Sequence, residues 1–263
     1  MIFSPSVFKY LTELRKYNYE KDIIVPLIND GKVVSYKSSE YAKDMGTPER
    51  YRRVQEDYNS GICDAKNLAN KQKAIFLDRD GTINEYVGFL RKEEDFRLIP
   101  GVSEAIKKIN NSGYLAIVVT NQPVIARGEV TEEELEEIHK KMETLLGLDG
   151  AYIDDIYYCP HHPDKGFEGE IPELKIECDC RKPKTGMLEK AAREHNIDLS
   201  SSIMIGDSTL DIKMAENAGM QSVLLKTGQK GEDGKYHVSP TLIAEDLNDA
   251  INKIICKKVS KKL

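Results

Sequence analysis

Residues 73–82 read Lys-Ala-Ile-Phe-Leu-Asp-Arg-Asp-Gly-Thr, and this stretch decides the fold class. Its apolar run, Ala74 to Leu77, predicts a buried parallel strand that ends on two carboxylates, Asp78 and Asp80. In open α/β sheets the ligand lies at the carboxyl ends of the strands. Two clustered carboxylates repel each other unless a cation or a shared proton compensates them, and Mg²⁺ prefers such oxygen ligands. The stretch therefore predicts a magnesium site, with a plain strand and Asp-Gly turn as the alternative.

Strands and helices alternate after this stretch. Further short, buried strands are predicted at residues 117–119, 203–205 and 223–225. Helices are predicted at residues 103–110, 131–146, 185–196 and 210–218. Thr131 and Glu134 have the spacing of a capping box at the start of the second helix. This alternation predicts an α/β fold with a doubly wound parallel sheet.

Three later segments carry polar residues at the ends of predicted elements. Residues 115–121 read Leu-Ala-Ile-Val-Val-Thr-Asn, residues 181–183 read Arg-Lys-Pro, and residues 203–211 read Ile-Met-Ile-Gly-Asp-Ser-Thr-Leu-Asp. Together with Asp-x-Asp-Gly-Thr, and in this order, they resemble the signature motifs of the haloacid dehalogenase-like superfamily. The resemblance covers about residues 71–255 and implies the fold of that superfamily.

The resemblance also implies catalytic roles. Asp78 would be the nucleophile that forms an aspartyl phosphate, and Asp80 would be the general acid and base. Magnesium would be bound by the Asp78 carboxylate, the Asp80 backbone carbonyl and Asp207. Asp211 would either support this site or be an ordinary helix residue.

Five further residues are expected to bind the substrate. Thr120, Asn121 and Lys182 would surround the transferred phosphoryl group. Arg127 and Arg181 would hold a second phosphate through paired hydrogen bonds. The alternative for Lys182 and Arg127 is a solvated position with no ligand.

Three of the five cysteines form a cluster with histidine. Cys159, His161, Cys178 and Cys180 can provide a closed, tetrahedral zinc site, with His162 as the alternative to His161. The loop between the two pairs has little apolar content, so zinc would act as a structural staple. Unligated loop residues are the simpler alternative.

The zinc loop and its Cys-x-Cys-Arg-Lys-Pro end resemble a narrower branch, the D-glycero-D-manno-heptose 1,7-bisphosphate phosphatases and histidinol phosphatases. Residues 120–128 read Thr-Asn-Gln-Pro-Val-Ile-Ala-Arg-Gly, and the Ile-Ala-Arg-Gly portion is similar to the heptose enzymes. The resemblance implies removal of the C7 phosphate in nucleotide-activated heptose synthesis. Pro123-Val124 stands where heptose enzymes often have Ser-Gly, so the anomer stays open. A histidinol phosphatase and a non-catalytic module of a fused enzyme are the alternatives.

The first 72 residues predict a small α+β extension and a linker. Val25 to Tyr36 alternates around Asn29-Asp30-Gly31, which predicts a β-hairpin. Residues 41–51 lead into a helix through Tyr58, and they resemble the C-terminal end of sugar-phosphate nucleotidyltransferases, where Asp44 matches a metal position. The expected division is 1–60 for this truncated segment, 61–72 for the linker, 73–256 for the phosphatase domain and 257–263 for a frayed basic tail.

Composition limits the partners. The chain has 263 residues, 40% of them hydrophobic, and a net charge of -6, which argues against nucleic-acid binding. The sequence has no run of 18 apolar residues, so no membrane span is predicted. Clustered cysteines favour metal binding in a reducing compartment, hence the cytoplasm, over disulfides. The expected partner is a small phosphorylated sugar, and the oligomeric state is open.

Other polar residues between the motifs are expected to be solvated. These are Lys92, Glu93, Glu94, residues 132–137, His139 and His195. Residues 88–95 are expected to form a small cover, in which Phe89 and Leu90 pack either as a lid or in the core. About 20 residues separate Thr82 from Gly101, too few for the large helical cap of related phosphotransferases and mutases.

Overall fold

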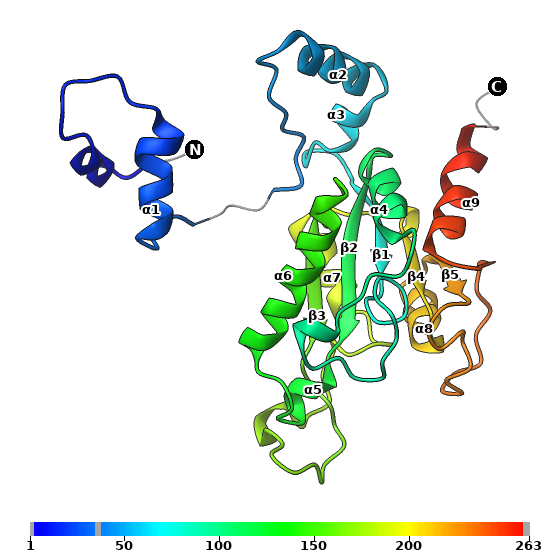
Figure 1. Cartoon of the computed structure of the whole chain (residues 1–263). Coiled ribbons are helices and arrows are strands. Elements are labelled where there is room, and N and C mark those ends of the chain that lie inside the picture. Colours follow the sequence, from blue (N-terminus) through cyan, green and yellow to red (C-terminus); the bar gives the residue numbers. More distant parts are fainter. Residues whose placement is uncertain (1–2, 35–37, 260–263) are drawn as a thin grey trace. The chain divides into compact units, whose positions relative to one another are not determined.

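The computed structural model describes residues 3–34 and 38–259, and it divides the chain into two compact units (Figure 1). The first unit covers residues 1–38 and the second covers residues 39–263. None of the described residues 3–34 is buried, whereas the second unit has an extensive core. The hydrophobic driving force for folding is therefore concentrated in the second unit.

The second unit is built around one parallel sheet of six strands (Figure 1). The strands are β1 Lys73–Leu77, β2 Tyr114–Asn121, β3 Asp155–Cys159, β4 Ile203–Gly206, β5 Gln221–Leu225 and β6 Leu242–Ala244. Their order is β3-β2-β1-β4-β5-β6, and all pairs are parallel. The direction of winding reverses between β1 and β4, which places a ligand crevice at their carboxyl ends.

The doubly wound α/β prediction is confirmed, and two edge strands were missed. The predicted strands at residues 74–77, 117–119, 203–205 and 223–225 lie within β1, β2, β4 and β5. Strands β3 and β6 lie at the two edges of the sheet. Each is only partly buried, so neither has the continuous apolar run that indicates a central strand.

Helices cover both faces of the sheet. They are α4 Val102–Asn110, α5 Pro123–Ala126, α6 Glu132–Leu148, α7 Gly186–Glu194, α8 Thr209–Asn217 and α9 Leu247–Val259. On β1, Ile75 and Leu77 pack in one buried cluster with residues of α4, α6 and α9, while Ala74 and Phe76 pack in another with residues of α7 and α8. Because alternate side chains of β1 point to two buried faces of the sheet, residues 74–77 are all apolar.

The four helix predictions are confirmed as α4, α6, α7 and α8, with ends that differ by one or two residues. The capping box is also confirmed, because Thr131 N–H donates to Glu134 Oε2 at 2.8 Å and Glu134 N–H donates to Thr131 Oγ1 at 3.1 Å. Helix α9, which extends to Val259, was not predicted. Within the described ranges, no helix is long and apolar enough to cross a membrane.

Residues 39–72 belong to the second unit and contact loops that precede its strands. They contain α2 Pro48–Asn59 and α3 Ile62–Ala65. Gln72 pairs with the segment after α7, accepting from Asp198 N–H at 2.9 Å, and Lys66 Nζ donates to the Tyr152 hydroxyl at 2.8 Å. Ser39 Oγ lies 3.2 Å from His195 Nδ1, whose Nε2 pairs with Asp155 Oδ2 at 2.9 Å, so the solvated position expected for His195 is wrong.

The predicted hairpin is also wrong within the described residues. Residues Val25–Asn29 form helix α1, which directly follows a wide helical turn at Tyr19–Ile24. Gly31 has φ +64, Gly31 N–H donates to Ile28 C=O at 2.9 Å, and Lys32 N–H donates to Leu27 C=O at 2.9 Å. These are the bonds of a helix C-terminus closed by a left-handed glycine. Tyr36 lies outside the described residues.

Removal of residues 1–38 tests the independence of the second unit. Since no described side chain at positions 3–34 is buried, residues 39–263 alone should unfold cooperatively, with a free energy of unfolding within about 1 kcal/mol of the full chain. Chemical denaturation measures this value. Removal of residues 1–72 is the matched comparison, and it should destabilise the fold because Tyr152 and Asp198 lose their partners. Equal stability of both truncated chains would contradict the account.

Candidate active site

The predicted catalytic and substrate-binding residues line one cavity at the carboxyl edge of the sheet. The cavity has a volume of about 190 Å³. Its lining includes Asp78, Asp80, Thr120, Asn121, Arg127, Arg181, Lys182 and Asp207. Asp78 follows β1 and Asp207 follows β4, so the site sits at the point where the sheet reverses its winding.

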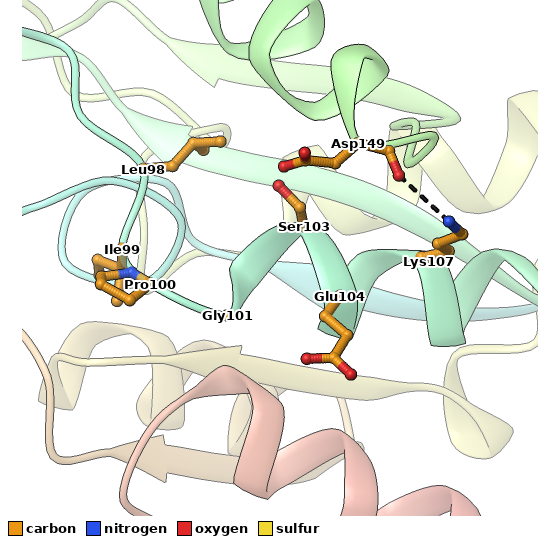
Figure 2. Close-up of a pocket in the computed structure, with 8 residues that line it drawn as sticks. All are labelled: Leu98, Ile99, Pro100, Gly101, Ser103, Glu104, Lys107 and Asp149. Atoms are coloured by element: carbon orange, nitrogen blue, oxygen red, sulfur yellow. Dashed lines mark hydrogen bonds between the residues drawn. The ribbon is translucent and has the colours of Figure 1, made fainter.

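A second concavity, of about 380 Å³, lies along α4 (Figure 2). It is lined by Leu98, Ile99, Pro100, Gly101, Ser103, Glu104, Lys107 and Asp149. Lys107 Nζ donates to the Asp149 carbonyl at 3.2 Å across its rim. None of the predicted site residues reaches it. The smaller cavity therefore holds the chemistry.

Three buried carboxylates cluster near the Lys182 ammonium, beside the smaller cavity. Ligand oxygens of Asp78, Asp207 and Asp211 lie within 4.8 Å of one another. Lys182 Nζ donates to Asp78 Oδ1 and to Asp211 Oδ1, each at 2.6 Å, and to the Val119 carbonyl at 3.2 Å. One ammonium cannot neutralise three carboxylates, and an additional divalent cation would balance the charge.

The pKa values show the same deficit of positive charge. Burial raises the pKa of Asp78 to about 7, with Asp211 and Asp80 adding repulsion while Lys182 opposes the rise. Burial and repulsion from Asp78 raise the pKa of Asp207 to about 8. The oxygen donor set therefore fits Mg²⁺, which would offset this repulsion.

Two glycines hold the Asp207 carboxylate. A Cβ on Gly81 or on Gly228 would overlap Asp207 Oδ2, and both glycines have positive φ, +85 and +51. The Gln229 N–H donates to the same oxygen at 2.6 Å. Close approach of two backbone segments thus fixes one oxygen and leaves the other to bind a ligand.

Asp211 is buried next to the cavity and is held by Ser208 and Lys182. Its carboxylate is completely buried, and Oδ2 accepts from the Ser208 N–H at 3.1 Å and the Ser208 hydroxyl at 2.6 Å, while Oδ1 accepts from Lys182. Any Cβ at position 206 would overlap this carboxylate, so Gly206 permits its position. Both oxygens of Asp211 are therefore engaged by protein donors.

Asp80 does not face the carboxylate cluster. Its oxygens accept from Arg79 Nη2 at 2.8 and 2.9 Å, from Asn84 Nδ2 at 3.0 Å and from Gln122 Nε2 at 3.0 Å. Burial opposes ionisation, but the Arg79 charge and these hydrogen bonds lower the pKa of Asp80 below its usual value. These contacts fix the orientation of the Asp80 carboxyl group next to Asp78.

The expected phosphate-binding residues are linked through the backbone. The Lys182 N–H donates to Asn121 Oδ1 at 3.0 Å, and Asn121 Nδ2 donates to the Lys182 carbonyl at 3.3 Å. Thr120 Oγ1 accepts from Gln122 Nε2 at 2.8 Å. Asn121 therefore positions Lys182 at the end of β2, in addition to lining the cavity.

Two arginines lie at the rim. The Arg127 guanidinium lies between two aromatic rings, 4.3 Å from the centroid of Phe89 and 4.4 Å from that of Phe167. Arg181 Nη1 donates to the His161 carbonyl at 3.1 Å. Phe89 is thus part of the rim, whereas the adjacent Leu90 is buried in the core. Stacking on two rings fixes the plane of the Arg127 fork.

The cysteine cluster is assembled as the spacing predicts. Cys180 Sγ lies 3.2 Å from Cys159 Sγ, 3.2 Å from Cys178 Sγ and 3.3 Å from His161 Nδ1. All four donor atoms lie within 4.8 Å of one another, and the thiols are free. His162 points elsewhere, with Nδ1 accepting from the Asp164 N–H at 3.2 Å, and it lines the cavity. The donor set fits a tetrahedral zinc ion.

Comparison with known proteins agrees with this geometry. Residues 179–250 match the HAD-hydrolase-like family model. Over 160 residues the chain is 44% identical to D-glycero-beta-D-manno-heptose-1,7-bisphosphate 7-phosphatase of Haemophilus ducreyi, covering 60% of this chain and 85% of that protein. It is also 44% identical over 160 residues, with the same coverage, to D-glycero-alpha-D-manno-heptose-1,7-bisphosphate 7-phosphatase of Photorhabdus laumondii.

The chain belongs to this haloacid dehalogenase-like phosphatase family. A solved structure from the same group, D,D-heptose 1,7-bisphosphate phosphatase of B. bronchiseptica with magnesium and phosphate, superposes with a TM-score of 0.62 at 32% identity. The match covers 71% of this chain and 99% of that one. One matched relative is named for the beta anomer and the other for the alpha anomer, so sequence identity does not distinguish the two anomers as substrates.

Several cavity residues of this family member were not predicted. They are Tyr86, Gln122, His162, Ser208, Gln229 and Lys235. Arg79 and His139 were also missed, and the solvated position expected for His139 is wrong because the residue is buried, with Nε2 3.3 Å from Arg79 Nη1. His139 shares the buried face of α6 with Leu135 and Met142. The helical spacing of these three residues is the sequence pattern that could have predicted the burial of His139.

Substitution of Gly228 tests whether Gly81 and Gly228, here called the glycine cradle, position the Asp207 carboxylate. Gly228→Ala should displace the Asp207 carboxylate and lower phosphatase turnover by about 10²-fold, since small misplacements of catalytic groups have effects of this size. Gly234→Ala is the matched control, because Gly234 has φ +66 but open space around a Cβ. Both glycines have positive φ, so both variants carry backbone strain. Equal activities in the two variants would show that the cradle does not position Asp207.

Proposed function

We propose that this protein is a magnesium-dependent phosphatase that removes the C7 phosphate of D-glycero-D-manno-heptose 1,7-bisphosphate. The observation that carries the proposal is the set of three buried carboxylates around a single lysine, next to a rim with two arginines. A nucleophile, a charge deficit for a cation and a cationic rim are what phosphoryl transfer from a bisphosphate requires. The names of the similar enzymes give the same substrate.

In the first step, an Asp78 oxygen attacks the phosphorus and forms an aspartyl phosphate, while the bond from phosphorus to the sugar oxygen breaks. Asp80, protonated for this step, gives its proton to that oxygen. In the second step, water attacks the phosphorus, Asp80 accepts the proton, and the bond to Asp78 breaks. Magnesium, held by the Asp78 and Asp207 carboxylates and the Asp80 carbonyl, would offset the phosphoryl charge. Lys182 fixes Asp78 throughout.

The second phosphate is proposed to bind at the rim. Arg127 and Arg181 line the cavity, and stacking between Phe89 and Phe167 pre-orients the Arg127 fork for two parallel hydrogen bonds. Thr120, Asn121 and Lys182 surround the transferred group instead. This arrangement would hold a substrate with phosphates at both ends better than one with a single phosphate.

Zinc is proposed to be structural. The four donors leave no position open for substrate, so zinc would hold the loop without taking part in the reaction. The loop contacts the rim, because the Ile171 N–H donates to the Ala126 carbonyl at 3.0 Å and Phe167 stacks on Arg127.

The pathway proposal extends to the N-terminal segment. We infer that residues 1–60 are a nucleotidyltransferase-like segment without transferase activity, which suggests nucleotide-activated heptose synthesis in the cytoplasm. Within residues 39–60, Asp44 pairs with Arg50, and Thr47 caps α2 by accepting from the Arg50 N–H at 3.3 Å. In this structure, Asp44 and Thr47 thus bind residues at the start of α2. The four cysteines whose side chains the structure describes are free thiols, which fits a reducing compartment.

Substitution of the nucleophile tests the reaction. Asp78→Asn keeps the size of the side chain but removes the attacking carboxylate, so turnover should fall by on the order of 10³-fold or more. The measurement is kcat/KM with magnesium for the heptose bisphosphate, histidinol phosphate and an aryl phosphate. The heptose bisphosphate should give the highest kcat/KM. A higher value for histidinol phosphate, or normal turnover of the variant, would contradict the proposal.

Substitution of a thiol ligand tests the zinc site. Cys178→Ser should reduce the zinc content from one ion per chain and lower the free energy of unfolding by several kcal/mol. Elemental analysis and denaturation measure both effects. Cys63→Ser is the matched control, because Cys63 is a free thiol outside the cluster. A zinc-free wild-type protein of full stability would exclude the staple.

A further inference from the structure

We propose that Arg79 is a positioning residue for Asp80, and that it governs the proton-transfer steps without contributing to nucleophilic attack. The inference rests on the proposed aspartyl-phosphate reaction. Arg79 lies between Asp78 and Asp80 in the sequence but does not line the cavity. Its role follows from what its guanidinium binds on each side.

One side of the guanidinium binds the Asp80 carboxylate. Nη2 donates to Oδ2 at 2.8 Å and to Oδ1 at 2.9 Å, and Nε lies 3.3 Å from Oδ1. The planar fork therefore fixes the plane of the carboxylate as well as its distance. Asn84 and Gln122 each add one hydrogen bond, but neither contacts both oxygens. Arg79 is the partner that can set the orientation.

The guanidinium is also anchored to two separate elements. Nη2 also donates to Gln122 Oε1 at 3.1 Å, just after β2, and Nη1 lies 3.3 Å from His139 Nε2 on α6. Since a guanidinium has only donors, His139 Nε2 must be the unprotonated nitrogen. The Arg79 side chain is completely buried. Asp80 is thus held by the scaffold through Arg79, and lysine cannot reproduce this fork.

The consequence is a selective effect on the reaction. An Asp80 with the wrong orientation gives its proton poorly to a sugar oxygen and takes one poorly from water. Attack by Asp78 does not need Asp80 when the leaving group is a stable phenolate. Loss of Arg79 should therefore slow the release of a sugar and the hydrolysis of the aspartyl phosphate, while phenolate release is spared.

Arg79→Lys tests this with 2,4-dinitrophenyl phosphate and magnesium in rapid mixing. The expected result is a burst of about one phenolate per active site, at a rate within about threefold of wild type, followed by a steady rate that is lower by about 10²-fold. The phosphorylated enzyme should accumulate, and turnover of the heptose bisphosphate should fall by a similar factor with little change in KM. A burst that slows in parallel with the steady rate would overturn the inference.

Two further variants keep the test decisive. His139→Leu removes the anchor of Nη1 and leaves Arg79 in place, so it should show the same pattern at about tenfold and replaces Arg79→Lys if that variant does not fold. Arg53→Lys, on exposed α2, should match wild type in both phases. A wild-type protein that hydrolyses neither substrate would refute the proposed function. An active wild type with a normal steady rate in Arg79→Lys would refute only the role of Arg79.

Discussion

The ammonium of Lys182, bound between Asp78 and Asp211, is the interaction on which the site depends. It joins the end of β1 to the start of α8, and its backbone is held by Asn121 at the end of β2. Because all three charged groups are buried, loss of one partner would leave uncompensated charge in a low-dielectric environment. Lys182 follows Cys180 closely in the sequence, which links its backbone to the cysteine cluster.

Separate cations would serve separate parts of the proposed reaction. Lys182 contacts Asp78, Arg79 holds Asp80, and Arg127 and Arg181 lie at the rim. Burial and repulsion from Asp78 raise the pKa of Asp207, and a divalent cation bound at this carboxylate would offset the repulsion. Each step of the proposed reaction thus has its own source of positive charge.

The sequence predicted the parts of the fold that depend on continuous patterns. Central strands such as β1 are buried on both faces, so their apolar runs were visible, and the carboxylates at their ends indicated the site. Edge strand β3 has mixed burial and gave no such run. Asn29-Asp30-Gly31 was misinterpreted because hairpin turns and helix ends both favour a left-handed glycine. Arg79 and His139 act through contacts between distant elements, which single-sequence patterns do not show.

Phosphorus NMR of the reaction with D-glycero-D-manno-heptose 1,7-bisphosphate tests the central claim most directly. With magnesium, the C7 phosphate resonance should disappear as inorganic phosphate appears, while the C1 resonance persists, because the charge-deficient cluster acts on one phosphate and the arginine rim holds the other. With a chelator in place of magnesium, both resonances should remain. Loss of the C1 phosphate first, or equal turnover without magnesium, would contradict the account.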